Sequence, residues 1–512
     1  MTDPDDRSAG GDDGTDGDAG DLTDAADAPV DDLGAVLSTV RERVTPDADE
    51  RERLSAAAAD LAERARDAVA DLPSPADEAD VLTVGSTARG TWLAGDRDID
   101  LFVRFPTALS RTELERFGLR VGHAVLPDGE EEYAEHPYVV GNVDGFDVDL
   151  VPCYGVQAAT EIRSAVDRTP FHNEYLRERL TEDLAGDVRV LKAFLKGVGV
   201  YGSDLRTRGF SGYLTELLVV EHGGARETLE AVADWHPPVR FDPEDHGTAE
   251  FDDPLVVVDP TDPERNVAAV LSGDNLARLQ HHARDLLTDP RTDPFFPDPT
   301  EPITAEECRE HVRRRDTAPV AVAFDAPDIV DDQLYPQLRR SLSGIERELD
   351  GRGFDVIRSA TFATDRDSAT DPVPDPATGD APDGDGTDRA AGRRAVLLVE
   401  LASRELPAIE RHEGPPVHVR DHAAGFHGKY AGDPDAYGPF VADGRYVVER
   451  ERPPDERDAV AVLESDRIFE AALGARVESA LETGYDVLAR ESLADLTDRF
   501  GADLREYFEP SV

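Results

Sequence analysis

One stretch, from Val84 to Phe102, limits the possible folds of this chain more than any other. Within it, Asp98 and Asp100 stand one residue apart, with apolar residues between and after them. In a β-strand, side chains at positions i and i+2 lie on the same face, roughly 6–7 Å apart. Two carboxylates on one face cannot enter an apolar core without a cation. The stretch therefore predicts a strand with one buried apolar face and one face that binds a divalent metal ion.

Two neighbouring features strengthen this prediction. Gly85 and Ser86 form a turn after a short apolar strand, and such a turn at the start of a helix offers backbone N–H groups to an anion. A third acid, Asp149, lies in an apolar strand at 146–151 that pairs with 138–143 through a turn. Solvent-facing acids are common in this chain, so the Asp-x-Asp pattern alone carries little weight. Together, three acids on two strands fit two Mg²⁺ ions about 3.5–4 Å apart.

The net charge of −56 comes from 110 acidic and 54 basic residues, and only three of the bases are lysine. This balance is typical of adaptation to molar salt, where the screening length is roughly 3 Å at about 1 M ionic strength. The acid excess is then a solvated surface. Overall charge therefore says little about nucleic-acid partners, although a low pI would ordinarily argue against them.

The cysteine content and the lack of targeting segments indicate where the protein is expected to reside. The two cysteines, Cys153 and Cys308, belong to no Cys/His cluster, which argues against a zinc site or a disulfide framework. The sequence has no apolar run of membrane-spanning length and no signal peptide. We therefore expect a soluble, cytoplasmic protein that does not interact with a membrane.

The spacing of apolar residues along the chain predicts a multidomain α+β protein. Residues 1–30 are acidic and lack apolar content, which is typical of a disordered extension. Apolar spacing predicts many helices, and a β-α-β-β order predicts a small ferredoxin-like unit. The predicted helices lie near 33–44, 45–72, 88–93, 111–125, 169–180, 188–198, 210–220, 259–271, 272–286, 466–483 and 492–508, and one more begins at 304; the ferredoxin-like unit spans 320–401, with an inserted loop at 365–393, and a hairpin follows at 440–450.

Several longer strings are more specific than the acids. The glycine-serine turn, the Asp-Ile-Asp strand and the third aspartate resemble the DNA polymerase β-like nucleotidyltransferase superfamily. The strings G-S-T-A-R-G-T-W-L-A-G-D-R-D-I-D-L-F, D-V-D-L-V-P-C-Y, D-R-T-P-F-H-N-E-Y-L, R-G-F-S-G-Y-L and V-V-D-P-T-D-P-E-R-N-V-A-A together resemble the archaeal (class I) CCA-adding tRNA nucleotidyltransferases. The resemblance covers about residues 33–290 and extends more weakly over 300–510.

This resemblance implies an enzyme that adds C, C and A to the 3′ end of tRNA from CTP and ATP without a nucleic-acid template, releasing pyrophosphate. It also implies a head, neck, body and tail. Their expected bounds are 31–165 for the catalytic head, 166–256 for the helical neck, 257–315 and 451–512 for the two parts of the body, and 316–450 for a tRNA-binding tail.

By position, Asp98 and Asp100 resemble the two shared metal ligands of the family, and Asp149 resembles the third carboxylate, near the primer 3′-hydroxyl. The positions that resemble nucleotide-binding residues are Ser86, Arg89, His172, Lys192, Tyr201 and Arg265. Simpler interpretations exist for these residues. Arg89 or Arg265 could be an ordinary ion-paired arginine, Arg265 with Asp262 at a helix start, and Tyr201 could be a core aromatic. Lysine at 192 has independent support, since so few lysines are retained.

The expected partners are the acceptor end and top half of tRNA, together with ATP, CTP and two Mg²⁺ ions. The sequence leaves open whether the chain forms a homodimer. The basic strings at 313–315, 339–340 and 427–430 are candidates for RNA contact. Two alternatives have the same head: a poly(A) polymerase or oligoadenylate synthetase-like enzyme, and a catalytically silent RNA-binding module. The complete set of three acids argues against the second.

Overall fold

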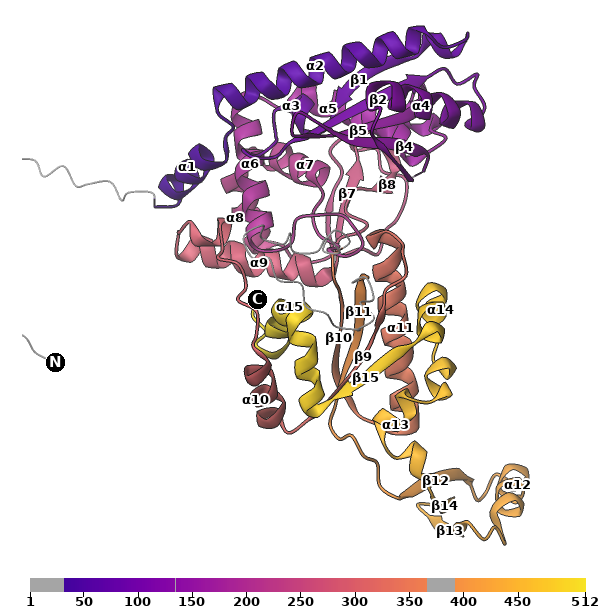
Figure 1. The fold of residues 1–512 in the computed structure, drawn as a ribbon. Helices are drawn as coiled ribbons and strands as arrows, with labels where there is room; N and C mark the ends of the chain where they lie inside the picture. Colours follow the sequence, from indigo (N-terminus) through magenta and orange to yellow (C-terminus); the bar gives the residue numbers. More distant parts are fainter. Residues whose placement is uncertain (1–31, 134, 366–391) are drawn as a thin grey trace, which may run out of the picture.

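The computed structural model describes residues 32–133, 135–365 and 392–512. The expected extension at 1–30 and nearly all of the expected insertion at 365–393 lie outside these residues. Figure 1 shows an elongated chain, with the first sheet at one end and a small lobe at the other. Within the described residues, no helix is both long enough and apolar enough to cross a membrane.

The head is a five-stranded sheet with the strand order β1-β2-β5-β4-β3. Its helices α2 and α4 contact each other and pack on the sheet, and the shared core lies beneath them. The predicted hairpin at the turn Asp144-Gly145 is confirmed. The bounds are β1 Asp80–Val84, β2 Asp98–Phe105, β3 Glu130–Tyr133, β4 Pro137–Val143, β5 Phe146–Tyr154, α2 Ala48–Ala70, α3 Gly85–Arg89 and α4 Arg111–Val125.

The neck is mainly helical and has its own core, which includes the first helix, α1. It also holds a small three-stranded sheet, β6-β7-β8. The prediction of a helix at 259–271 was wrong, because β7 and β8 form a hairpin there. The bounds are α1 Asp32–Val44, α5 Thr169–Arg179, α6 Glu182–Gly197, α7 Gly212–His222, α8 Ala225–Asp234, α9 Gly273–Thr288, β6 Val239–Phe241, β7 Leu255–Asp259 and β8 Asp262–Asn266.

The third unit, for which we use the label body, is an antiparallel sheet with the order β10-β11-β9-β15, and it has a core on each face. Most of this sheet lies in the range expected for the tail. Helices α11, α13 and α14 cover one face, and α10 and α15 cover the other. The predicted β-α-β-β order is present, and β15 joins it from the far end of the chain. The bounds are β9 Ala318–Asp325, β10 Val356–Ala363, β11 Arg394–Leu401, β15 Tyr485–Ala489, α10 Ala305–Arg315, α11 Asp331–Arg352, α13 Ala459–Leu463, α14 Ala475–Thr483 and α15 Thr497–Phe508.

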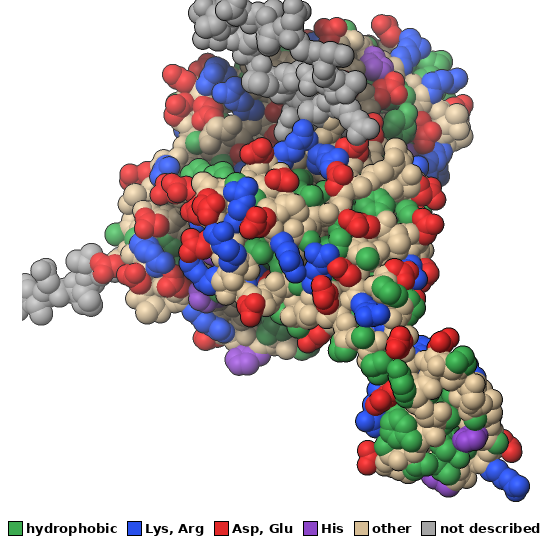
Figure 2. Space-filling view, turned by 60° about the horizontal axis from the view of Figure 1, so that its bottom comes forward, with side chains coloured by type: hydrophobic (Ala, Val, Ile, Leu, Met, Phe, Trp, Pro, Cys, Tyr) green, Lys and Arg blue, Asp and Glu red, His purple; other side chains and the backbone are tan. Residues whose placement is uncertain are grey.

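A small lobe projects from the body. It consists of the sheet β12-β14-β13 and helix α12, and Figure 2 shows hydrophobic side chains gathered on it. The bounds are β12 Ile409–Pro416, α12 Arg420–Tyr430, β13 Ala436–Ala442 and β14 Arg445–Glu451. Its large exposed hydrophobic residues are Ile409, Val417, Val419, Tyr437, Phe440 and Val441.

The buried cores cross several of the domain bounds expected from the sequence. Helix α1 packs with the neck rather than the head. The bound at 256/257 cuts β7, and the bound at 450/451 separates β15 from the sheet to which it belongs. The expected domain bounds cut the chain at single positions, whereas one sheet can contain strands that are far apart in the sequence.

Candidate active site

The three acids meet on neighbouring strands of the head. Strand β2 pairs in parallel with β5, and this register sets Asp100 opposite Asp149. The intervening residues, such as Ile99 and Leu101, point the other way and are buried in the head core. The Asp149 strand thus lies beside the Asp-Ile-Asp strand, as a shared three-acid site requires, and the alternation explains why the carboxylates share one face.

The glycine of the turn lies directly against one of these acids. Gly85 begins α3 immediately after β1, with a φ of +71°. A Cβ added there would lie 1.8 Å from Oδ2 of Asp100, so any side chain would collide with the carboxylate. The short helix that we expected at 88–93 therefore starts earlier, at the turn itself, and brings its first backbone groups to the acids.

The carboxylates raise one another's pKa. Burial, and then repulsion from Asp98, raises the pKa of Asp100 to about 6. Burial, and then repulsion from Asp100, raises the pKa of Asp149 to about 6. Arg89 and Lys192 act in the opposite direction on Asp100. The negative charge at this face is therefore only partly compensated by the protein's own cations.

This donor set suits a magnesium ion in its chemistry, because it consists of carboxylate oxygens with excess negative charge. The side chains do not yet surround one point: among the residues described, no three His, Cys, Asp or Glu side chains converge as ligands of one metal ion do. Assignment of Asp98, Asp100 and Asp149 as metal ligands therefore stays a prediction.

The raised pKa values give a testable pH dependence. In metal-free buffer at constant molar KCl, we expect the free energy of unfolding to fall as pH rises from about 4 to about 6. The folded state binds more protons than the unfolded state in that window, and a combined loss of about 2–4 kcal/mol follows for the coupled pair. Denaturant unfolding at several pH values measures it. The decline should be shallower in Asp100→Asn, and an equal decline in both proteins would contradict the assignment.

Arg89 joins the head to the neck. Its Nε and Nη2 donate to the carboxylate of Glu216 in α7, at 3.0 and 2.8 Å, and its Nη1 donates to Asn173. Thr91 donates to the same carboxylate. Glu216 is fully buried and the Arg89 side chain is 9% exposed. All three guanidinium nitrogens thus have protein partners. Arg89 is therefore an ion-paired arginine, as its simpler interpretation states, and its partner Glu216 lies in the neck.

Lys192 and Tyr201 lie together behind this ion pair. The Lys192 ammonium is buried, and its Nζ donates to the carbonyl of Thr91 at 3.0 Å. Burial lowers its pKa, and Glu216 opposes that effect. A Cβ added to Gly212 would lie 3.1 Å from the Tyr201 hydroxyl and 3.8 Å from Nζ. Ser86 is the second residue of α3 and follows Gly85, which lies against Asp100.

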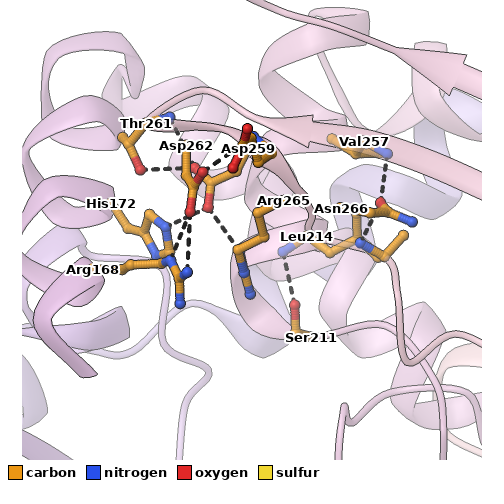
Figure 3. Close-up of polar contacts among 12 residues, drawn as sticks. Arg168, His172, Ser211, Leu214, Val257, Asp259, Thr261, Asp262, Arg265 and Asn266 are labelled. Atoms are coloured by element: carbon orange, nitrogen blue, oxygen red, sulfur yellow. Dashed lines mark hydrogen bonds and ion pairs between the residues drawn. The ribbon is translucent and has the colours of Figure 1, made fainter. Parts of the chain in front are cut away.

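His172 and Arg265 are brought together by an aspartate that we did not predict. Figure 3 shows both side chains directed at Asp259, the last residue of β7. His172 Nε2 and Arg265 Nη1 each lie 2.8 Å from its Oδ2. Asp262 pairs instead with Arg168, at 3.1 Å, so the Arg265–Asp262 pair of the simpler interpretation is absent from the described contacts. Arg265 and Arg168 also line a cavity of about 910 Å³.

Two buried acids, Asp259 and Glu216, are the site residues that sequence reasoning missed. Burial alone would raise the pKa of Asp259, but the hydrogen bond from His172, the backbone N–H of Thr261 and the charge of Arg265 hold it well below its usual range. Glu216 left a readable signal, since it is the only acid in the apolar run from Leu214 to Val220. An acid in such a run needs a buried partner.

Comparison with known proteins gives matches along most of the chain. A model of the nucleotidyltransferase domain matches residues 62–172. A model of the tRNA nucleotidyltransferase second domain matches 186–296, and one of the C-terminal domain of the CCA-adding enzyme matches 315–370 and 387–490. The head thus has the nucleotidyltransferase fold that the sequence indicates.

Whole proteins match as well. A CCA-adding enzyme of Haloarcula marismortui is 58% identical over 480 residues, which is 94% of this chain and 99% of that protein. A CCA-adding enzyme of Halorubrum lacusprofundi is 58% identical over 94% of this chain and all of its own length. One of Methanosarcina barkeri is 38% identical over 90% of this chain and 94% of its own.

Proposed function

The chain belongs to the CCA-adding enzymes, a family of tRNA nucleotidyltransferases, and on that premise we propose that it uses CTP and ATP to extend tRNA by two-metal catalysis. Family membership supports template-independent addition of C, C and A to the tRNA 3′ end. The observation that carries the finer proposal is the placement of Asp100 opposite Asp149, with the pKa of each raised to about 6. Several of the matched proteins come from halophilic archaea, which is consistent with the salt adaptation that the acidic composition indicates.

The acids have separate roles in this proposal. Asp98 and Asp100 would hold magnesium, and bound Mg²⁺ supplies positive charge to the triphosphate and the attacking oxygen. Asp149 would accept the proton of the tRNA 3′-hydroxyl as that oxygen attacks the α-phosphorus and pyrophosphate leaves. Asp149 suits this role by its place on β5 opposite Asp100, beside the proposed metal ligands. The absence of a side chain at Gly85 leaves room for the Asp100 carboxylate.

The nucleotide would lie between head and neck. Ser86 would offer the turn to the triphosphate, while His172, Lys192 and Tyr201 would contact the nucleotide from the neck. Arg265 would read the base, because a guanidinium offers several donors to the acceptors of cytosine. Arg89 supports these contacts indirectly in this proposal, by holding α3 against the neck through Glu216.

For tRNA we propose contacts along the body and the projecting lobe. The basic string at 313–315 is largely engaged, since Arg313, Arg314 and Arg315 pair with Glu306, Glu310 and Glu400. The lobe instead offers exposed aromatic and aliphatic side chains, which suit base stacking and sugar contact. We propose that the lobe is the tail, that the two-faced sheet is the body, and that α1 belongs to the neck.

The decisive experiment uses a tRNA that lacks its terminal C-C-A. With CTP alone, we expect the addition of two cytidines and then a stop; with ATP added, one adenosine should follow. Denaturing gel electrophoresis of labelled tRNA in molar KCl measures this directly. A ladder of adenosines from ATP alone would favour the poly(A) polymerase alternative, and no extension with any nucleotide would favour a silent RNA-binding module.

A further inference from the structure

The two oxygens of the Asp259 carboxylate accept hydrogen bonds from different parts of the protein. Its Oδ1 accepts from the backbone N–H and the hydroxyl of Thr261, at 2.9 and 2.8 Å. Its Oδ2 accepts from His172 and Arg265, which come from α5 and β8. One oxygen therefore fixes the aspartate to its own turn, and the other holds two side chains from different elements.

The two donors are restrained in different ways. A carboxylate with so low a pKa only accepts hydrogen bonds, so His172 must carry a proton on Nε2. The imidazole also stacks on Tyr213, with ring centroids 4.0 Å apart and an angle of 15°. Among the described contacts, the Arg265 guanidinium bonds only to Asp259, and its side chain is 35% exposed. One edge of that guanidinium is anchored while the rest faces the cavity that it lines.

We propose that Asp259 is the positioning residue for nucleotide selection: through Oδ2 it sets the orientation of Arg265 toward the base, and the same oxygen holds His172 beside that arginine. This inference rests on the proposed function, because it assigns Arg265 and His172 to the nucleotide. It adds that base choice and the position of His172 depend on one carboxylate. A base that moved Arg265 would disturb the hydrogen bond of His172 to the same oxygen.

The test is Asp259→Asn in the full-length protein, with kcat and KM measured for CTP and for UTP on tRNA lacking C-C-A. An amide cannot accept strongly from both donors, so we expect the KM for CTP to rise about 10- to 100-fold, with a smaller change in kcat. The preference for CTP over UTP in kcat/KM should fall by about tenfold or more, since a loosened donor rejects the wrong base poorly. Calorimetric titration with each nucleotide should show the same loss of preference.

Asp262→Asn is the matched control, because Asp262 is three residues away in the same hairpin and pairs with Arg168 instead. Its CTP preference should stay within about twofold of the unsubstituted protein. If Asp259→Asn fails to fold, Thr261→Val provides the test, since it removes one donor to Oδ1 and should lower the preference about threefold. Unchanged preference in a folded Asp259→Asn protein, or an equal loss in Asp262→Asn, would overturn the inference. Failure of the unsubstituted protein to add cytidine would overturn the proposed function instead.

Discussion

Asp100→Asn should lower the rate of nucleotide incorporation by about a thousandfold or more, because several kcal/mol of charge stabilisation disappear. Asparagine has nearly the same size, so it fits against Gly85 and preserves the pairing of β2 with β5. Affinity for tRNA should stay within about threefold, since in the proposed function the RNA is bound by residues far from Asp100. Single-turnover incorporation of cytidine and a filter-binding titration measure the two quantities.

Asp147→Asn serves as the control for this prediction. Asp147 lies on β5 two residues before Asp149, is exposed, and stands opposite Asp98 in the register. Its replacement removes a charge from the strand of Asp149 and from the same face of the sheet, while both carboxylates of the Asp100–Asp149 pair stay in place. Activity of Asp100→Asn equal to that of Asp147→Asn would remove the basis for the metal assignment.

Glu216→Ala should lower the free energy of unfolding by about 3–5 kcal/mol, because it leaves the Arg89 guanidinium buried without its counter-charge. The side chains of this pair are 0% and 9% exposed, so water cannot replace the lost partner. Denaturant unfolding in molar KCl measures the change. The loss should be larger than for most single substitutions in a protein of this size.

Glu221→Ala is the matched control in the same helix, because Glu221 is exposed. It should change the free energy of unfolding by less than about 0.5 kcal/mol. Glu216→Gln should fall between the two, since the amide oxygen still accepts from Arg89 while the charge is lost. Similar stability for Glu216→Ala and Glu221→Ala would show that the ion pair does not hold head and neck together.

The central acids were predictable because the pattern that identifies them is local. Ile99 and Leu101 alternate with Asp98 and Asp100, and a period of two places the acids on one face. The apolar pattern around Asp149 likewise predicted a strand, which could lie beside the first.

What escaped prediction depends on contacts between distant segments. Glu216 and Arg89 are 127 residues apart, and no local pattern joins them. The Asp-Pro pairs at 259–263 resemble a helix start, but the preceding β-branched run continues as β7, and Pro263 is tolerated because β8 is an edge strand. Asp259 therefore ends a strand, and its contact with His172 joins it to α5, which lies 87 residues away in the sequence.

The parallel pairing of β2 with β5 also has a consequence for how the chain folds. A slip of one residue along either strand would turn its aspartates toward the apolar core and its aliphatic residues toward solvent. Burying those carboxylates without partners is costly, so the misaligned sheet would be strongly disfavoured. The aspartates proposed for catalysis therefore also disfavour a wrong strand register during folding. The register that buries the head core is the same one that brings Asp100 and Asp149 together.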